Sequence, residues 1–122
     1  DKYPEVRLEK WNSGRLLLHL GAWAFYLTGY EILFRGLLFF PLADALGFWY
    51  ATALNTILYM IFHIPKGRNE TIASLPLGVG FCALTWYTGD VWAAVIIHTA
   101  MAWTGVLVGI QRFKASSRQP RS

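Results

Sequence analysis

The chain has little charge and almost no cysteine for its length. Only 15% of its 122 residues are charged, against 55% that are hydrophobic, whereas soluble domains carry roughly 25% charged residues. This shortage argues against a soluble domain. The single cysteine, Cys82, excludes an internal disulfide and a metal site built from several cysteines.

Acidic residues are scarcer than basic ones, with seven Asp and Glu against eleven Lys and Arg and a net charge of +4. In a soluble chain such an excess suggests a nucleic-acid partner. Here the basic residues flank long apolar stretches, where they suit the anionic headgroups of lipids. We therefore expect membrane lipids as neighbours and no nucleic acid.

Four apolar stretches are candidates for membrane-spanning helices, at residues 15–40, 47–63, 71–87 and 91–111. The first is longer than a hydrocarbon layer of about 30 Å requires. It is expected to tilt or to break near Gly29, and to end at Pro41. The third contains Pro76 and is expected to be a kinked helix. These stretches predict an all-α membrane protein with four spans.

Charged residues are distributed unevenly over the connections between these stretches. The two termini and the loop with Lys66 and Arg68 are basic, whereas the connections 43–46 and 88–90 carry Asp44 and Asp90 without Lys or Arg. By the positive-inside rule both termini are predicted to be cytoplasmic in a multi-pass protein. The expected organisation is an interfacial segment 1–14, a transmembrane domain 15–112 and a basic tail 113–122, which is expected to be disordered from Ala115 onward.

Ionisable residues inside membrane spans are costly and indicate function. Glu31 and Arg35 lie four residues apart in the first stretch, where an ion pair is the simplest explanation. His63 ends the second stretch on the same helical face as Tyr59. In straight helices Glu31 would lie roughly 24 Å along the first span, far from His63, so a tilt or break must bring the two together.

Three segments on successive stretches form a series of motifs. They are Tyr30-Glu31-Ile32-Leu33-Phe34-Arg35-Gly36, Tyr59-Met60-Ile61-Phe62-His63 and His98-Thr99-Ala100-Met101-Ala102. In this order they resemble Glu-Glu-x-x-x-Arg, Phe-x-x-x-His and His-x-x-x-Asn/Asp, the motifs of the CPBP family of CAAX-protease and bacteriocin-processing membrane proteins. The resemblance covers residues 27–105 and includes a stretch with Lys66 and Glu70 after His63.

This resemblance implies an intramembrane endopeptidase that needs neither a cofactor nor a metal ion. In the family a glutamate and the first histidine are thought to activate a water, and the second histidine to stabilise the oxyanion. Peptide hydrolysis needs such a base, a proton donor and oxyanion donors. The implied catalytic residues are Glu31, His63 and His98, and the implied supporting residues are Arg35, Tyr59 and Glu70.

Two positions depart from the family motifs and support a second interpretation. Tyr30 stands where the family has the first of its paired glutamates, and Ala102 stands where it has Asn or Asp. Loss of both suggests a non-catalytic scaffold that associates with other membrane subunits. A third interpretation is that His98 ligates a haem or a pigment, because small alanines surround it. His19 matches no motif and is assigned no role.

Overall fold

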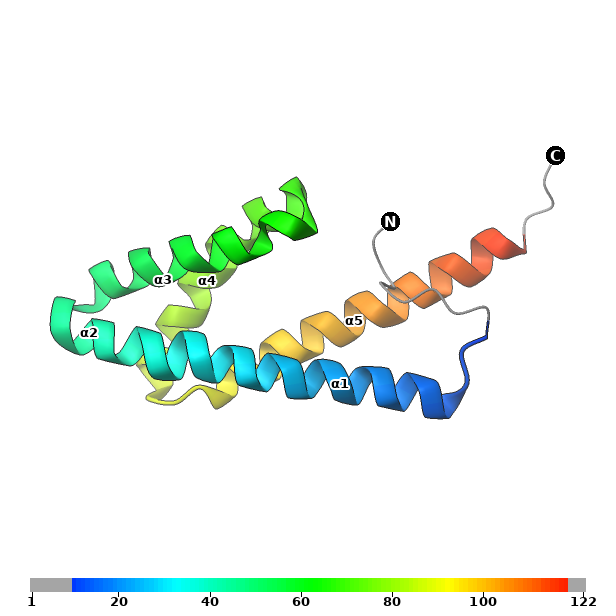
Figure 1. Ribbon diagram of the computed structural model, residues 1–122, viewed down its shortest axis with the longest axis horizontal. Helices are drawn as coiled ribbons and strands as arrows, with labels where there is room; N and C mark the ends of the chain where they lie inside the picture. Colours follow the sequence, from blue (N-terminus) through cyan, green and yellow to red (C-terminus); the bar gives the residue numbers. More distant parts are fainter. Residues whose placement is uncertain (1–9, 119–122) are drawn as a thin grey trace. The chain divides into compact units, whose positions relative to one another are not determined.

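The computed structural model describes residues 10–118, and every regular element in that range is helical. The elements are α1 (Ser13–Glu31), the π-helix η1 (Ile32–Phe39), α2 (Phe40–Leu46), α3 (Phe48–His63), the 3-10 helix η2 (Ile64–Lys66), α4 (Arg68–Thr88) and α5 (Trp92–Ser117) (Figure 1). The predicted all-α fold is confirmed. Most of the predicted interfacial segment, and the end of the predicted tail, lie outside the described residues.

The chain divides into two units, and each is described by itself. Unit 1 comprises Asp1–Leu27 and Ile97–Ser122, and unit 2 comprises Thr28–Ile96. In unit 1 the indole N–H of Trp103 on α5 donates a hydrogen bond to the carbonyl oxygen of Leu20 on α1, at 2.9 Å. Unit 2 contains η1, α2, α3 and α4 in full.

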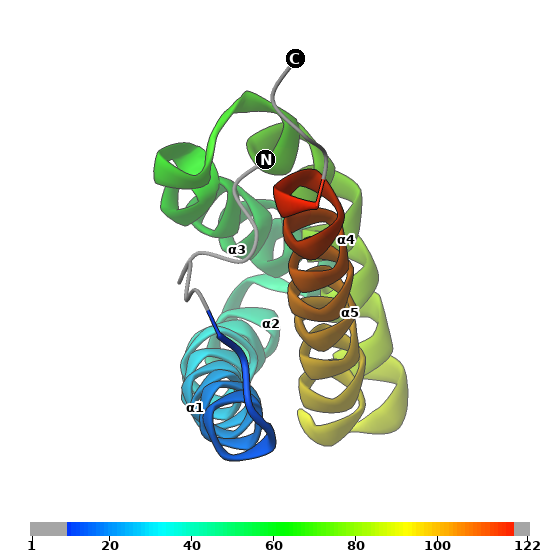
Figure 2. The same ribbon diagram turned by 90° about the vertical axis from the view of Figure 1, so that its right-hand side faces the viewer.

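The first helical segment runs without interruption from α1 through η1 and α2 to Leu46 (Figure 1). Figure 2 shows α2, α3 and α4 of unit 2 from a second direction. The predicted end at Pro41 is wrong, because the helical segment continues through Pro41 to Leu46. The segment ends instead at Gly47, whose φ of 85° suits glycine.

The break expected near Gly29 is also wrong, since α1 passes through Gly29 and the irregular part is η1. Glu31, Arg35, Phe39 and Ala43 are all buried, at strict intervals of four residues. In an α-helix four-residue steps turn a stripe by about 40° each. The wider turns of η1, such as the bond from the Phe40 N–H to the Arg35 carbonyl, slow this rotation and keep the stripe on one face.

Helices α3 and α4 pack side by side in unit 2 (Figure 1), and their buried faces are unusually polar. The buried residues of α3 are Ala51, Thr52, Asn55, Thr56, Tyr59 and His63, and those of α4 are Ser74, Gly78, Phe81, Cys82 and Thr85. The large side chains of α3 that face outward are apolar, namely Trp49, Tyr50, Leu54, Ile57, Leu58, Ile61 and Phe62. This polarity is the reverse of that in a soluble protein.

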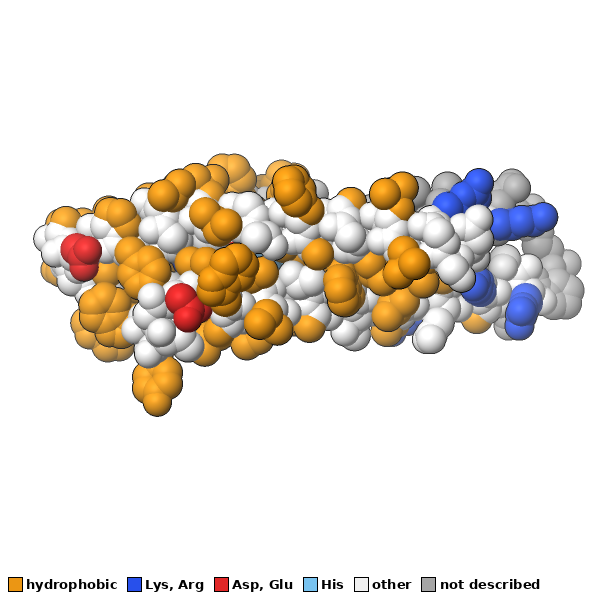
Figure 3. Space-filling model, turned by 90° about the horizontal axis from the view of Figure 1, so that it is seen from below, with side chains coloured by type: hydrophobic (Ala, Val, Ile, Leu, Met, Phe, Trp, Pro, Cys, Tyr) orange, Lys and Arg blue, Asp and Glu red, His pale blue; other side chains and the backbone are white. Residues whose placement is uncertain are grey.

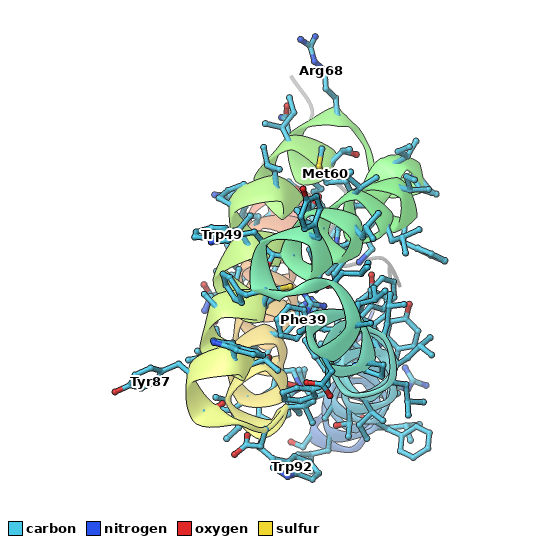
Figure 4. The ribbon with its side chains drawn as sticks, turned by 90° about the vertical axis from the view of Figure 1, so that its left-hand side faces the viewer. Phe39, Trp49, Met60, Arg68, Tyr87 and Trp92 are labelled. Atoms are coloured by element: carbon cyan, nitrogen blue, oxygen red, sulfur yellow. The ribbon has the colours of Figure 1, made fainter. Side chains whose placement is uncertain are left out.

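A small apolar cluster joins the end of the first helical segment to α3 and α4. It consists of Phe39, Ala43, Ala51 and Cys82. Figure 4 shows Phe39 directed inward among these helices, whereas Trp49 and Tyr87 project outward. The cluster anchors the end of η1 and the start of α2, so it helps to determine how η1 faces α3 and α4.

Two helical segments in residues 10–118 are long and apolar enough to cross a membrane, Ser13–Leu46 and Trp92–Ser117. Apolar side chains cover much of the face in Figure 3, and Leu18 and Phe25 of α1 are 77% and 85% exposed. The predicted second and third spans are present as helices α3 and α4. Helix α5 extends to Ser117 and so includes the first residues of the predicted disordered tail.

Gly78 on α4 generates a prediction about packing. A Cβ atom there would lie 3.0 Å from Thr56 Cγ2 and 3.2 Å from Tyr59 Cδ1, both buried, whereas one at Gly80 meets nothing within 4 Å. Gly78→Ala should therefore lower the free energy of unfolding by about 1–3 kcal/mol relative to Gly80→Ala, since the gain in helix propensity is common to both. Denaturant unfolding in micelles measures this difference, and equal stabilities would contradict the packing of α4 on α3.

Candidate functional site

The site is built around an ion pair that is fully enclosed by protein. Arg35 Nη1 lies 3.1 Å from Glu31 Oε2, and both side chains are 0% exposed. The i,i+4 pair expected from the sequence is confirmed. Two charges removed from solvent are tolerable only because each neutralises the other, and removal of one partner leaves an uncompensated buried charge.

Aromatic rings surround the guanidinium group of Arg35. Its Cζ atom lies 4.7 Å from the ring centroid of Tyr59, 5.2 Å from that of Phe81 and 5.9 Å from that of Phe34. Cation–π contacts with these rings, together with the carboxylate of Glu31, therefore stabilise its charge.

Tyr59 connects this ion pair to His63. The ring of Tyr59 lies 4.3 Å from the imidazole centroid, and His63 Nδ1 is 2.8 Å from the Tyr59 carbonyl oxygen. Because a carbonyl oxygen only accepts, Nδ1 carries the proton and donates this bond. In the neutral imidazole Nε2 is then the basic nitrogen. Glu31, Arg35, Tyr59 and His63 thus belong to one buried cluster, despite the depth difference expected from straight helices.

Asn55 belongs to the same cluster, and the motif comparison missed it. Its Nδ2 donates a 2.6 Å hydrogen bond to the carbonyl oxygen of Phe34 in η1, and its Oδ1 accepts a 3.3 Å hydrogen bond from Cys82 Sγ. The available signal was the four-residue spacing of Asn55, Tyr59 and His63, which places all three on one face of α3.

The remaining candidate residues lie outside this core. His98 and Ala102 are on α5 in unit 1 and are partly buried, so the grouping of His98 with Glu31 and His63 stays a prediction. Glu70 lies in the first turn of α4, where the helix dipole favours an acidic side chain. Tyr30 stacks on Phe34, with ring centroids 4.5 Å apart, and meets Tyr59 edge-on at 6.0 Å.

A bound metal ion would need several of these side chains as ligands. Within residues 10–118 no group of three or more His, Cys, Asp or Glu side chains is arranged to hold a metal ion. The described cluster brings together a carboxylate, an imidazole and a guanidinium.

The enclosed ion pair predicts that mutations of Glu31 and Arg35 have coupled effects on the free energy of unfolding. Arg35→Ala should lower the free energy of unfolding by about 3–5 kcal/mol, because it leaves the Glu31 carboxylate buried without a counter-charge. Combining it with Glu31→Gln should restore part of that loss, since no charge then remains. Denaturant unfolding of the single and double variants measures this coupling.

Arg15→Ala is the control for this experiment, because Arg15 is an exposed arginine at the start of α1. Its replacement should change the free energy of unfolding by less than about 0.5 kcal/mol. If Arg35→Ala lowers the free energy of unfolding by the same amount in the wild-type chain and in the Glu31→Gln variant, the two side chains do not interact.

Neither the curated proteins nor the solved structures gave a match to the chain. The family model described as type II CAAX prenyl endopeptidase Rce1-like matches residues 12–104, well over half of the 122 residues. This range contains Glu31, Arg35, His63 and His98 in the order of the CPBP motifs. The chain therefore belongs to the Rce1-like family of type II CAAX prenyl endopeptidases.

Proposed function

We propose that the chain is an integral membrane endopeptidase that cleaves a CAAX-type peptide with a water activated by Glu31 and His63. The observation that carries this proposal is the buried cluster in which Tyr59 connects the Glu31–Arg35 pair to His63. These four residues come from two separate family motifs, and the matched range 12–104 includes both.

The proposed chemistry uses the groups of this cluster in successive steps. A water oxygen attacks the scissile carbonyl carbon while Glu31, assisted by Nε2 of His63, accepts the water proton. The imidazole of His98 donates a hydrogen bond to the developing oxyanion. The proton then passes to the leaving amine as the C–N bond breaks. Arg35 balances the charge of Glu31 and orients its carboxylate.

A membrane location is the second part of the proposal. The outward apolar and inward polar faces of α3 support it, because lipid, unlike water, favours apolar side chains at the surface. The two long apolar segments support it as well. The described residues of unit 1 include no Asp or Glu. Their basic side chains suit anionic lipid headgroups. The basic residues are Lys10, Arg15, Arg112, Lys114 and Arg118. Figure 3 shows basic side chains gathered where α1 begins and α5 ends.

A non-catalytic scaffold is the second candidate function, and particular observations favour it. Tyr30 packs against Phe34 where the family motif has a glutamate, and Ala102 offers no side-chain hydrogen bond at the end of the third motif. The ion pair is 0% exposed, which suits a structural role. Such a scaffold would bind other membrane subunits through its apolar outer faces.

Hydrolysis of a farnesylated CAAX peptide by the full chain in proteoliposomes distinguishes the two candidates. We expect measurable cleavage, and a fall in kcat of about 100-fold or more for Glu31→Gln and for His63→Ala, because each removes a proton-transfer group. Ala102→Asn should raise the rate by supplying a second oxyanion donor.

His19→Ala is the control, since His19 is a partly buried histidine of α1 outside the motifs, and it should keep the rate. Folded protein is quantified in parallel by circular dichroism. A wild-type chain without cleavage supports the scaffold. A loss of activity in Glu31→Gln that only matches its loss of folded protein argues against a catalytic Glu31.

The proposed topology has its own test by cysteine labelling. Cys82 is 0% exposed, so the native thiol should stay unlabelled by an impermeant maleimide. Cysteines introduced at the exposed positions Ser13, Asn69 and Ser116 should react only from the cytoplasmic side. Those at Ala45 and Tyr87 should react only from the opposite side. Labelling of both sets from one side would overturn the four-span topology.

A further inference from the structure

Asn55 is a single side chain that bridges three elements of unit 2. It projects from α3, donates to the carbonyl oxygen of Phe34 in η1 at 2.6 Å, and accepts from Cys82 Sγ of α4 at 3.3 Å. Asn55 and Cys82 are 0% exposed. A buried amide with both ends bonded to different helices fixes their relative position.

The chemistry of the partners determines which way this amide points. A carbonyl oxygen accepts and never donates, so the atom facing Phe34 must be the NH₂ group. Oδ1 is then left to face Cys82, whose S–H is a weak donor. The bond to Phe34 is therefore the stronger of the two, and the bond to Cys82 is the weaker.

The acceptor of the stronger bond lies directly beside the ion pair in the chain. The carbonyl of Phe34 and the N–H of Arg35 form one planar peptide unit, so a bond that holds this carbonyl also holds the backbone of Arg35. This unit lies within the π-helix Ile32–Phe39. Wide helical turns are rare and need specific support, and Asn55 supplies a donor to one of their carbonyls.

Side-chain contacts around the same peptide show what this position controls. The Phe34 ring stacks on Tyr30 at 4.5 Å and meets Phe62 of α3 edge-on at 5.5 Å. The guanidinium of Arg35 lies 4.7 Å from the ring of Tyr59. A shift of the peptide would move both side chains away from the face of α3 that carries His63.

We propose that Asn55 is a positioning residue that holds the Phe34–Arg35 peptide in its π-helical geometry and thereby sets the Glu31–Arg35 pair against Tyr59. Its consequence for hydrolysis rests on the proposed function. Its effect on the geometry of η1 does not depend on the proposed function, so the structural and the catalytic parts of the proposal can fail separately.

Hydrogen–deuterium exchange of the full chain in micelles tests the structural part. Asn55→Leu keeps the number and branching of the side-chain heavy atoms and removes the donor. We expect amides of residues 35–40 to exchange about tenfold faster, which corresponds to roughly 1.4 kcal/mol for one hydrogen bond. Amides of residues 17–27 in α1 should keep their rates.

Two control variants separate the Phe34 bond from other effects. Cys82→Ser nearly keeps the side-chain volume beside Phe39 and keeps a donor to Asn55 Oδ1, and Thr52→Val makes a buried polar residue on the same face of α3 apolar, where Thr52 Oγ1 has no hydrogen-bond partner in residues 10–118. Both should leave exchange in 35–40 unchanged. The proposal is overturned if either control speeds amide exchange in residues 35–40 as strongly as Asn55→Leu does. It is also overturned if Asn55→Leu speeds exchange uniformly along the chain.

If Asn55→Leu does not fold, Asn55→Ser is used, because its hydroxyl is too short to reach Phe34 and the same local acceleration is expected. In the peptidase assay Asn55→Leu should lower kcat about tenfold with KM unchanged, as for a residue that orients catalytic groups. Unchanged kcat in an active wild-type background overturns the catalytic part. A wild-type chain that does not cleave overturns the proposed function and leaves the exchange result to decide the role of Asn55.

Discussion

The ion pair of Glu31 and Arg35 is the constraint on which the rest of unit 2 depends. Two opposite charges enclosed at 3.1 Å require a precise geometry, because the cost of removing them from water is recovered only when they stay together. The rings of Phe34, Tyr59 and Phe81 occupy the remaining surroundings of the guanidinium. Unit 2 therefore folds around a polar centre.

The π-helix η1 allows the backbone to meet this constraint. A stripe repeating every four residues winds around an α-helix, so Glu31 and Ala43 would face different directions. The wider turns of η1 keep the stripe on one face, and Asn55 bonds to the backbone next to Arg35. An irregular helix at a site of polar side chains is a common feature of functional sites.

The polarity of α3 connects the fold to family membership. Its polar side chains Asn55, Tyr59 and His63 are buried, and its large outward side chains are apolar. A chain of the Rce1-like family needs such an arrangement to present polar groups inside an apolar envelope. The proposed peptidase and the alternative scaffold share this arrangement.

The sequence by itself determined the helical fold, the places of α3 and α4, the ion pair and the family, because apolar runs, four-residue spacings and ordered motifs are local patterns. It did not predict that the helix continues past Pro41, since tolerance of proline depends on the turn in which it falls. Only the tertiary structure decided that Tyr59 joins Arg35 to His63 and that Asn55 bonds to Phe34. Those contacts join different helices, and the spacing of residues along one chain carries no information about which helices pack together.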